Sequence, residues 1–131
     1  MISPNKLDYT VSPPAGGKEN ILLSTSGGLR IIDTNSILRV EAISNYSKLI
    51  FTDGRSLVVA KLLSWFEEKL PGYQFSRLHR GHLVNLRYIK SYNSFSNYEV
   101  VLSNNETLSV SKRKRTEFKK AIYHYYYGGR Q

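Results

Sequence analysis

The sequence predicts a mainly β fold of antiparallel sheets, with one short internal helix and a C-terminal helix. Short apolar segments rich in β-branched residues recur from Ile21 onward, and turn residues separate them. Apolar residues fall at helical spacing in two segments, 61–70 and 112–127. The chain has 131 residues, a usual length for one domain, and its 40% hydrophobic residues can supply a core.

Residues 1–20 are expected to be a flexible tail. They contain three of the four prolines and show neither helical nor strand periodicity. We therefore place the folded domain at residues 21–127 and a short C-terminal tail at residues 128–131.

The first half of the domain is predicted to be a series of strands, at residues 21–24, 29–32, 37–43, 47–52 and 56–60. Asp53 and Gly54 lie between the last two strands, and this dipeptide favours the positive φ angles of a tight turn. These two strands are therefore expected to form a hairpin.

The segment 61–70 is predicted to be a short amphipathic helix. Leu62, Phe66 and Leu70 recur at helical spacing, and Pro71 with Gly72 ends the segment. The helix interrupts the run of strands and separates the two halves of the domain.

Strand patterns return after this helix, at residues 75–78, 83–92, 98–103 and 107–110. A terminal helix is then predicted from about Lys112 to Tyr127, with Gly128 and Gly129 ending it. Its apolar residues recur at intervals of 3, 4 and 7: Phe118, Ala121, Ile122 and Tyr125.

Positive charge is concentrated in the second half of the chain. Residues 1–76 contain eight Lys or Arg and seven Asp or Glu, whereas residues 77–131 contain eleven and three. These counts give +1 and +8, which sum to the net charge of +9. Two basic clusters carry the excess, at residues 77–90 and 112–115. Such an asymmetry is typical of nucleic-acid binding, because phosphates relieve the repulsion.

Other classes of protein find little support in the sequence. The absence of cysteine excludes disulfides and thiolate chemistry and fits a cytoplasmic protein. No apolar run approaches the roughly 20 residues of a membrane span, so no membrane partner is expected. Neither a catalytic constellation nor a cofactor motif is present, so we predict no enzyme and no cofactor. His79 and His82 lack a third ligand, so no metal site is predicted.

The basic run 112–115 is predicted to contact DNA. It lies where the terminal helix should begin, and there the helix dipole already presents partial positive charge. Cations at this end do not stabilise the helix, but together with free backbone N–H groups they suit a phosphate or a guanine edge. The alternative is a solvated charge run.

The second cluster contains a sharp turn that should expose an arginine. Gly81 permits the turn and directs Arg80 outward, where its guanidinium can bind a phosphate or a guanine. Asn85 is more consistent with a structural role than with an adenine contact. His79 is expected to be a packed or hydrogen-bonded strand residue.

Two groups of aromatic residues have more than one interpretation. Tyr46 lies in the polar interruption 45–48, so it is either a loop-tip binding residue or a core aromatic. The tyrosines within 123–127 are expected in the core or on a self-association surface.

Three ordered blocks of this chain form a recognisable pattern: VEAISNY at 40–46, FSRLHRGHLVNLRYI at 75–89 and LSVSKRKR at 108–115. Together they resemble the LytTR family of DNA-binding domains, and the match extends from about residue 21 to residue 122. The family is usually found at the C-terminus of bacterial response regulators. The resemblance implies a mainly antiparallel β fold whose loops enter successive major grooves of DNA.

Carried over by position, the resemblance implies base contacts by Ser47, Arg80 and Arg113. It implies contacts to the DNA backbone by Lys48, Arg77, Lys112 and Arg115. His79 and Asn85 would support these loops. Gly81 and His82 replace the serine and bulky apolar residue more usual after this His-Arg pair, so the second loop should differ from the family.

The function implied is sequence-specific binding of double-stranded DNA by a standalone bacterial transcription regulator. A receiver domain needs about 110 to 120 residues, and only about 20 precede the first predicted strand. The alternative is that the chain is one piece of a longer protein. Expected partners are DNA, a second copy on repeated half-sites and a separate signalling protein. One alternative is a protein interaction module that pairs with another regulator without reading DNA. RNA or general anion binding is another.

Overall fold

The computed structural model describes residues 19–128. Residues 1–18 of the expected N-terminal tail lie outside the described residues, as do residues 129–131 of the C-terminal tail. The described part consists of three antiparallel sheets and two α-helices, so the predicted fold class is confirmed. No helix within it is long and apolar enough to cross a membrane.

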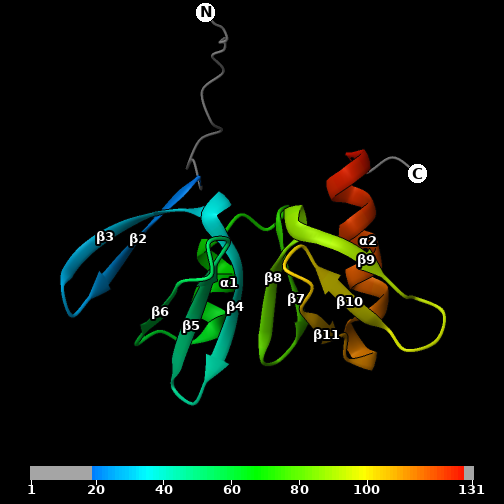
Figure 1. Cartoon of the computed structure of the whole chain (residues 1–131), viewed down its shortest axis with the longest axis horizontal. Helices are drawn as coiled ribbons and strands as arrows, with labels where there is room; N and C mark the ends of the chain where they lie inside the picture. Colours follow the sequence, from blue (N-terminus) through cyan, green and yellow to red (C-terminus); the bar gives the residue numbers. More distant parts are fainter. Residues whose placement is uncertain (1–18, 129–131) are drawn as a thin grey trace, which may run out of the picture.

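The chain begins with a two-stranded hairpin. It pairs β2 (Asn20–Thr25) with β3 (Gly28–Asp33), and it projects from one end of the molecule (Figure 1). Because side chains alternate between the faces of a strand, Leu23 is buried whereas its neighbour Leu22 is exposed. The tail was expected to extend to residue 20, but Asn20 already pairs with Asp33.

The central sheet has five antiparallel strands in the order β6-β5-β4-β8-β7. They are β4 (Ile37–Ile43), β5 (Tyr46–Phe51), β6 (Ser56–Val59), β7 (Phe75–His79) and β8 (His82–Asn85). The predicted hairpin at residues 53–54 is confirmed: β5 pairs with β6, and Gly54 has φ 91°. Helix α1 (Leu63–Lys69) connects β6 to β7 and buries Leu63 and Phe66 against the sheet.

The third sheet contains β9 (Ile89–Tyr92), β10 (Glu99–Leu102) and β11 (Thr107–Ser109), in the order β11-β10-β9. We predicted one strand over 83–92, and the structure instead divides it with the 3₁₀ helix η2 (Leu86–Tyr88). The side chain of Asn85 accepts a hydrogen bond from Arg87 N at 2.9 Å, which stabilises the turn that ends β8. A second 3₁₀ helix, η1 (Thr34–Ser36), precedes β4.

The C-terminal helix α2 (Arg115–Tyr127) begins three residues later than predicted. Residues Lys112–Lys114 form the 3₁₀ helix η3, in which Lys114 N donates to Ser111 O at 2.9 Å. No side chain caps either helix start. The predicted end is confirmed, since Gly128 adopts the left-handed conformation at φ 63°.

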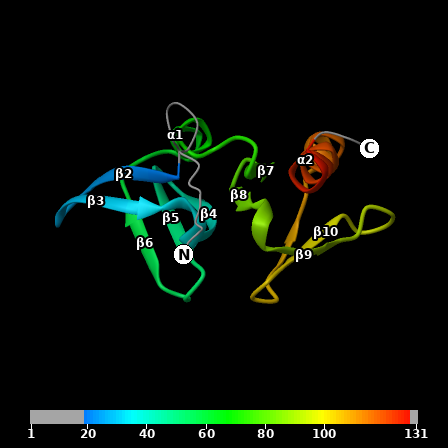
Figure 2. The same cartoon turned by 90° about the horizontal axis from the view of Figure 1, so that it is seen from above.

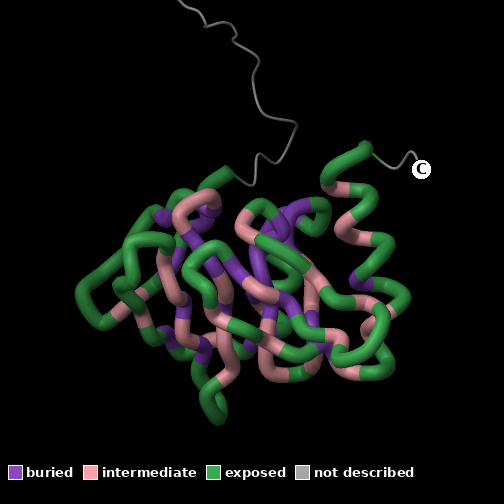
Figure 3. Tube along the Cα trace, turned by 45° about the vertical axis from the view of Figure 1, so that its right-hand side comes forward, coloured by how far each residue is buried: buried purple, intermediate pink, exposed green. Residues whose placement is uncertain are grey.

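Two hydrophobic cores lie on opposite faces of the central sheet. One face presents Leu49 and Leu83 to α1, whereas the next residues, Ile50 and Val84, face the core that surrounds Phe118 of α2. Figure 2 shows α1 beside the five-stranded sheet and α2 beside the three-stranded sheet. Figure 3 shows the buried residues on the inner strands and exposed residues on the turns and on α2.

Candidate nucleic-acid interface

Three segments that are distant in sequence lie along one edge of the molecule. We call them the loop edge: the β4–β5 turn at 44–45, the β7–β8 turn at 80–81, and η3 at 112–114. Ala42 N donates to Gly81 O at 2.9 Å, which joins the first segment to the second. Ser111 N donates to Leu78 O at 3.0 Å, which joins the second to the third. All three are at the lower end of Figure 1.

Arg80 and Arg113 lie together on this edge. Both line a hollow of about 230 Å³, and the other lining residues are Arg77, His79, Ser111 and Lys114. The lining contains no carboxylate, and both Arg80 and Arg113 are exposed. The hollow therefore concentrates positive charge between the β7–β8 turn and η3, as an anion site requires.

Arg77 holds the β7–β8 turn in place. Its Nε donates to His79 O at 3.0 Å and its Nη2 donates to Arg80 O at 2.8 Å. Its Nη1 forms an ion pair with Glu67 Oε1 of α1 at 2.6 Å. We expected Arg77 to contact the DNA backbone, and the structure shows that all three of its nitrogens already have protein partners. Its guanidinium positions Arg80.

The two histidines of the β7–β8 hairpin pack edge to face, and His79 accepts a hydrogen bond from the backbone of the turn. Gly81 N donates to His79 Nδ1 at 3.0 Å, so this nitrogen carries no proton. The proton of neutral His79 is then on Nε2, which lies 3.2 Å from His82 Nδ1. Burial lowers the pKa of His79, and the nearby charges of Arg77 and Arg80 lower it further. The turn is therefore held by a neutral imidazole near pH 7.

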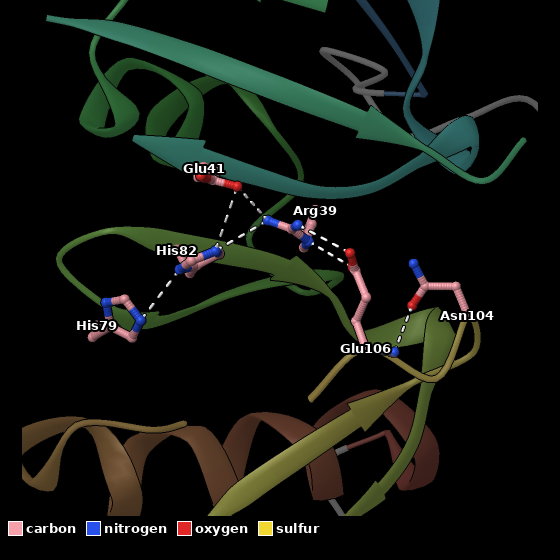
Figure 4. A network of polar contacts seen from close by, with 6 residues as sticks. All are labelled: Arg39, Glu41, His79, His82, Asn104 and Glu106. Carbon is pink, nitrogen blue, oxygen red and sulfur yellow. Dashed lines mark hydrogen bonds and ion pairs between the residues drawn. The ribbon is translucent and has the colours of Figure 1, made fainter. Parts of the chain in front are cut away.

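Arg39 connects this hairpin to the rest of the fold (Figure 4). Its guanidinium pairs with Glu106 at 2.8 and 3.2 Å and with Glu41 at 2.8 Å. It also lies 3.0 Å from His82 Nε2. Burial, followed by the charge of Arg39, lowers the pKa of His82. The network joins β4, β8 and the β10–β11 turn.

Ser47 was expected to contact a base, and the structure contradicts this. Its side chain is fully buried, and Oγ donates to Lys61 O at 2.7 Å. The turn lies at Ser44 and Asn45, so Ser47 is already within β5 and shares its inward face with Leu49. Ser47 lies two residues before the apolar Leu49, so on a strand both side chains point to the same face. This spacing is the sequence signal that would have identified Ser47 as buried.

The residues beside Ser47 face outward. Lys48 is half-buried and pairs across the strands with Glu41, whose pKa is lowered chiefly by its hydrogen bond to Arg39 and also by the charge of Lys48. Tyr46 is 50% exposed next to the turn, so its position is that of a loop-tip residue and not of a core aromatic.

The four cations of 112–115 have different surroundings. Lys112 and Arg113 are exposed. Lys114 Nζ lies 3.4 Å from Glu117 Oε1. The Arg115 guanidinium stacks on the Tyr98 ring at 3.7 Å, so this predicted backbone contact packs against the domain. Lys114, which belongs to the predicted basic run 112–115 but was given no role of its own, also lines the hollow.

Asn85 is completely buried between the two halves of the domain. Its Nδ2 donates to Ile37 O at 2.9 Å and its Oδ1 accepts from Arg87 N at 2.9 Å. Gln74 Nε2 also lies 3.3 Å from Oδ1. This side chain therefore supports the fold and presents no group to a ligand.

Comparison with known proteins identifies a family and two relatives. The family described as the LytTr DNA-binding domain matches residues 27–123. The sensory transduction protein LytT of Bacillus subtilis (strain 168) is 28% identical over 109 residues, which are 82% of this chain and 45% of that protein. The chain thus spans less than half the length of this relative.

A solved structure has the same fold. It is the LytTr DNA-binding domain of a Bacillus cereus protein described as a methyl-accepting/DNA response regulator. The TM-score is 0.69 and the sequence identity 25%, over 81% of this chain and 98% of that one.

Proposed function

We propose that this chain, which belongs to the LytTr DNA-binding domain family, binds specific sites in double-stranded DNA through its loop edge and thereby regulates transcription. The observation that carries the proposal is the hollow shared by Arg80 and Arg113. Two arginine forks with a fixed spacing can each bind the O6 and N7 acceptors of a guanine in the major groove.

The surrounding cations would set the register on the DNA. Lys112 is exposed beside Arg113, and Lys114 lines the same hollow, so both are placed to bind phosphates. Lys48 lies near the β4–β5 turn and extends this surface. Arg77 and Asn85 act indirectly in this proposal, because they shape the β7–β8 hairpin and contact other protein groups.

We further propose that the domain binds DNA by itself, with two copies on repeated half-sites. All three segments of the loop edge belong to one folded unit, and backbone hydrogen bonds of residues in or next to these segments join them. A single copy covers few base pairs, so a repeated site would supply the remaining affinity.

The test is selection of binding sites from a random duplex pool with the purified chain, followed by two arginine substitutions. Arg113→Ala should weaken binding to the selected site by about 1–3 kcal/mol and relax specificity at one base pair. Arg30→Ala removes another exposed arginine, which lies in β3 outside the loop edge, and should leave specificity unchanged. A pool that enriches no motif would rule out specific DNA reading.

A further inference from the structure

A second surface lies between the edge strand β9 and helix α2. The two elements border a groove of about 490 Å³. Four consecutive residues of β9, Ile89–Tyr92, line one wall. Because successive side chains of a strand point to opposite faces, a wall made of consecutive residues means that the groove follows the edge of the strand.

The backbone of β9 is available along this edge. In the described part of the chain, β9 is the outermost strand of its sheet and pairs only with β10. An edge strand presents N–H and C=O groups that another extended chain can pair with. The length of β9, four residues, suits a short peptide segment.

Helix α2 supplies an aromatic wall. Lys119, Tyr123 and Tyr126 line the groove and recur at intervals of about one turn, so they share one face of the helix. Tyr126 Oη donates to Leu86 O at 2.9 Å, which fixes this ring at the base of the wall. Tyr127, next to it, is 62% exposed. Tyrosine side chains with little conformational freedom are typical of protein-binding surfaces.

The charge of the groove selects the kind of partner. Lys90 lies on the strand wall and Lys119 on the helix wall, and no carboxylate is among the lining residues. Lys90 Nζ donates to the uncharged Asn105 Oδ1 at 2.8 Å, so this contact does not neutralise its positive charge. Lys119 makes no ion pair within the described residues. Two lysines on opposite walls favour an acidic segment. A second copy of this chain fits poorly, because each copy carries a net charge of +9.

We propose that this groove binds an extended acidic peptide segment of a partner protein. The segment adds to β9 as a further strand and places its apolar side chains against the tyrosines of α2, while its carboxylates pair with Lys90 and Lys119. The loop edge includes η3, before the first turn of α2, whereas Tyr123, Tyr126 and Tyr127 are in its last turns (Figure 1). DNA and the peptide can therefore be bound together, and this docking holds whether or not the loop edge reads bases.

The experiment titrates the full chain with a seven-residue peptide in which glutamate and valine alternate. Backbone amide NMR spectra monitor the binding. The control peptide has lysine in place of glutamate. We expect amide shifts concentrated in Ile89–Tyr92 and in the second half of α2, and binding at least about tenfold weaker for the lysine peptide. Absence of shifts in β9, or equal binding of the two peptides, would overturn the proposal.

A matched pair of variants assigns the effect to the groove. Lys119→Glu should weaken binding of the acidic peptide about fivefold or more, whereas Lys120→Glu, the same charge change on an exposed neighbour outside the lining, should not. Both variants should keep the wild-type amide spectrum elsewhere and equal affinity for duplex DNA. Equal loss of peptide binding in both would indicate general charge attraction and contradict the proposal.

Two further outcomes would replace the peptide with another occupant. Shifts at β9 that depend on protein concentration without peptide would indicate a second copy in the groove. Displacement of the peptide by a duplex of random sequence would indicate that nucleic acid occupies it. Either result would contradict docking of an acidic protein segment.

Discussion

At the scale of single residues, the site residues proposed from the sequence have different roles in the structure, even where they share the same chemical type. Arg80 and Arg113 are exposed on one surface as their positions predicted, whereas Arg77 is held by its own turn and by α1. The sequence shows that a residue is an arginine with a positive charge. It does not show which backbone carbonyl groups a turn will place next to the guanidinium. Ser47 was assigned to a loop because the exact position of the β4–β5 turn was not known from the sequence. The turn lies at Ser44 and Asn45, so Ser47 is within β5.

The Arg39 network predicts how stability depends on pH. Hydrogen bonds from Arg39 lower the pKa of Glu41 and of Glu106. A carboxyl whose pKa is lower in the folded state stabilises the fold above its unfolded value, about 4.3, and this stabilisation is lost as pH falls through the folded value. We expect Arg39→Leu to cost about 1–2 kcal/mol at pH 7, since both carboxylates are partly exposed.

The measurement is urea unfolding followed by the fluorescence of Trp65, at several values between pH 7 and pH 3. The difference between Arg39→Leu and wild type should shrink as the pH falls below about 4.3. Arg55→Leu is the control, because Arg55 pairs with Asp53 on the surface, where its side chain is 85% exposed. A difference that is constant over the whole range would show that Arg39 acts by packing alone.

At the scale of elements, local sequence patterns located most strands, and the errors were at their ends. Short hairpins such as β5–β6 were predictable because the turn and both strands are encoded within a few residues. The division of 83–92 by η2 was not, because it depends on Asn85, whose partners include Ile37 from a distant strand. Likewise, the delay of α2 to Arg115 follows from the 3₁₀ turn of η3.

The β5–β6 turn provides a prediction about backbone conformation. Gly54 has φ 91°, a region that other residues adopt with strain, so Gly54→Ala should destabilise the domain by about 1 kcal/mol. Gly72 has no positive φ and open space around its Cα, so Gly72→Ala should be neutral or slightly stabilising. Thermal unfolding of the two variants compares them. Equal melting temperatures would refute a conformational role for Gly54.

At the scale of the whole molecule, the fold brings together what the sequence separates. The two basic clusters were recognisable from charge, but their meeting depends on the pairing of β7 with η3 through Ser111 and Leu78. Nothing local to either cluster specifies that contact. The sequence showed which residues carry charge, and the resemblance to a family supplied the expectation that the loops share one surface.

The charge of the assembled loop edge predicts a steep salt dependence of DNA binding. Five cations that could contact phosphates lie on it or beside it: Lys48, Arg80, Lys112, Arg113 and Lys114. If each neutralises one phosphate, log K should fall with log salt at a slope of about −4.5. Lys112→Ala should reduce the magnitude of this slope by about 0.9. Binding measured between 50 and 300 mM salt tests this, and an unchanged slope in Lys112→Ala would exclude a phosphate contact there.

The central sheet has a further consequence, since its interior strands include β4 and β8, which contribute side chains to both cores. Neither core can unfold while the other stays folded, because both cores pack against the same central strands. Heat should therefore unfold both halves in a single calorimetric transition. The amide protons of β4 and β8 should be the last to exchange with deuterium.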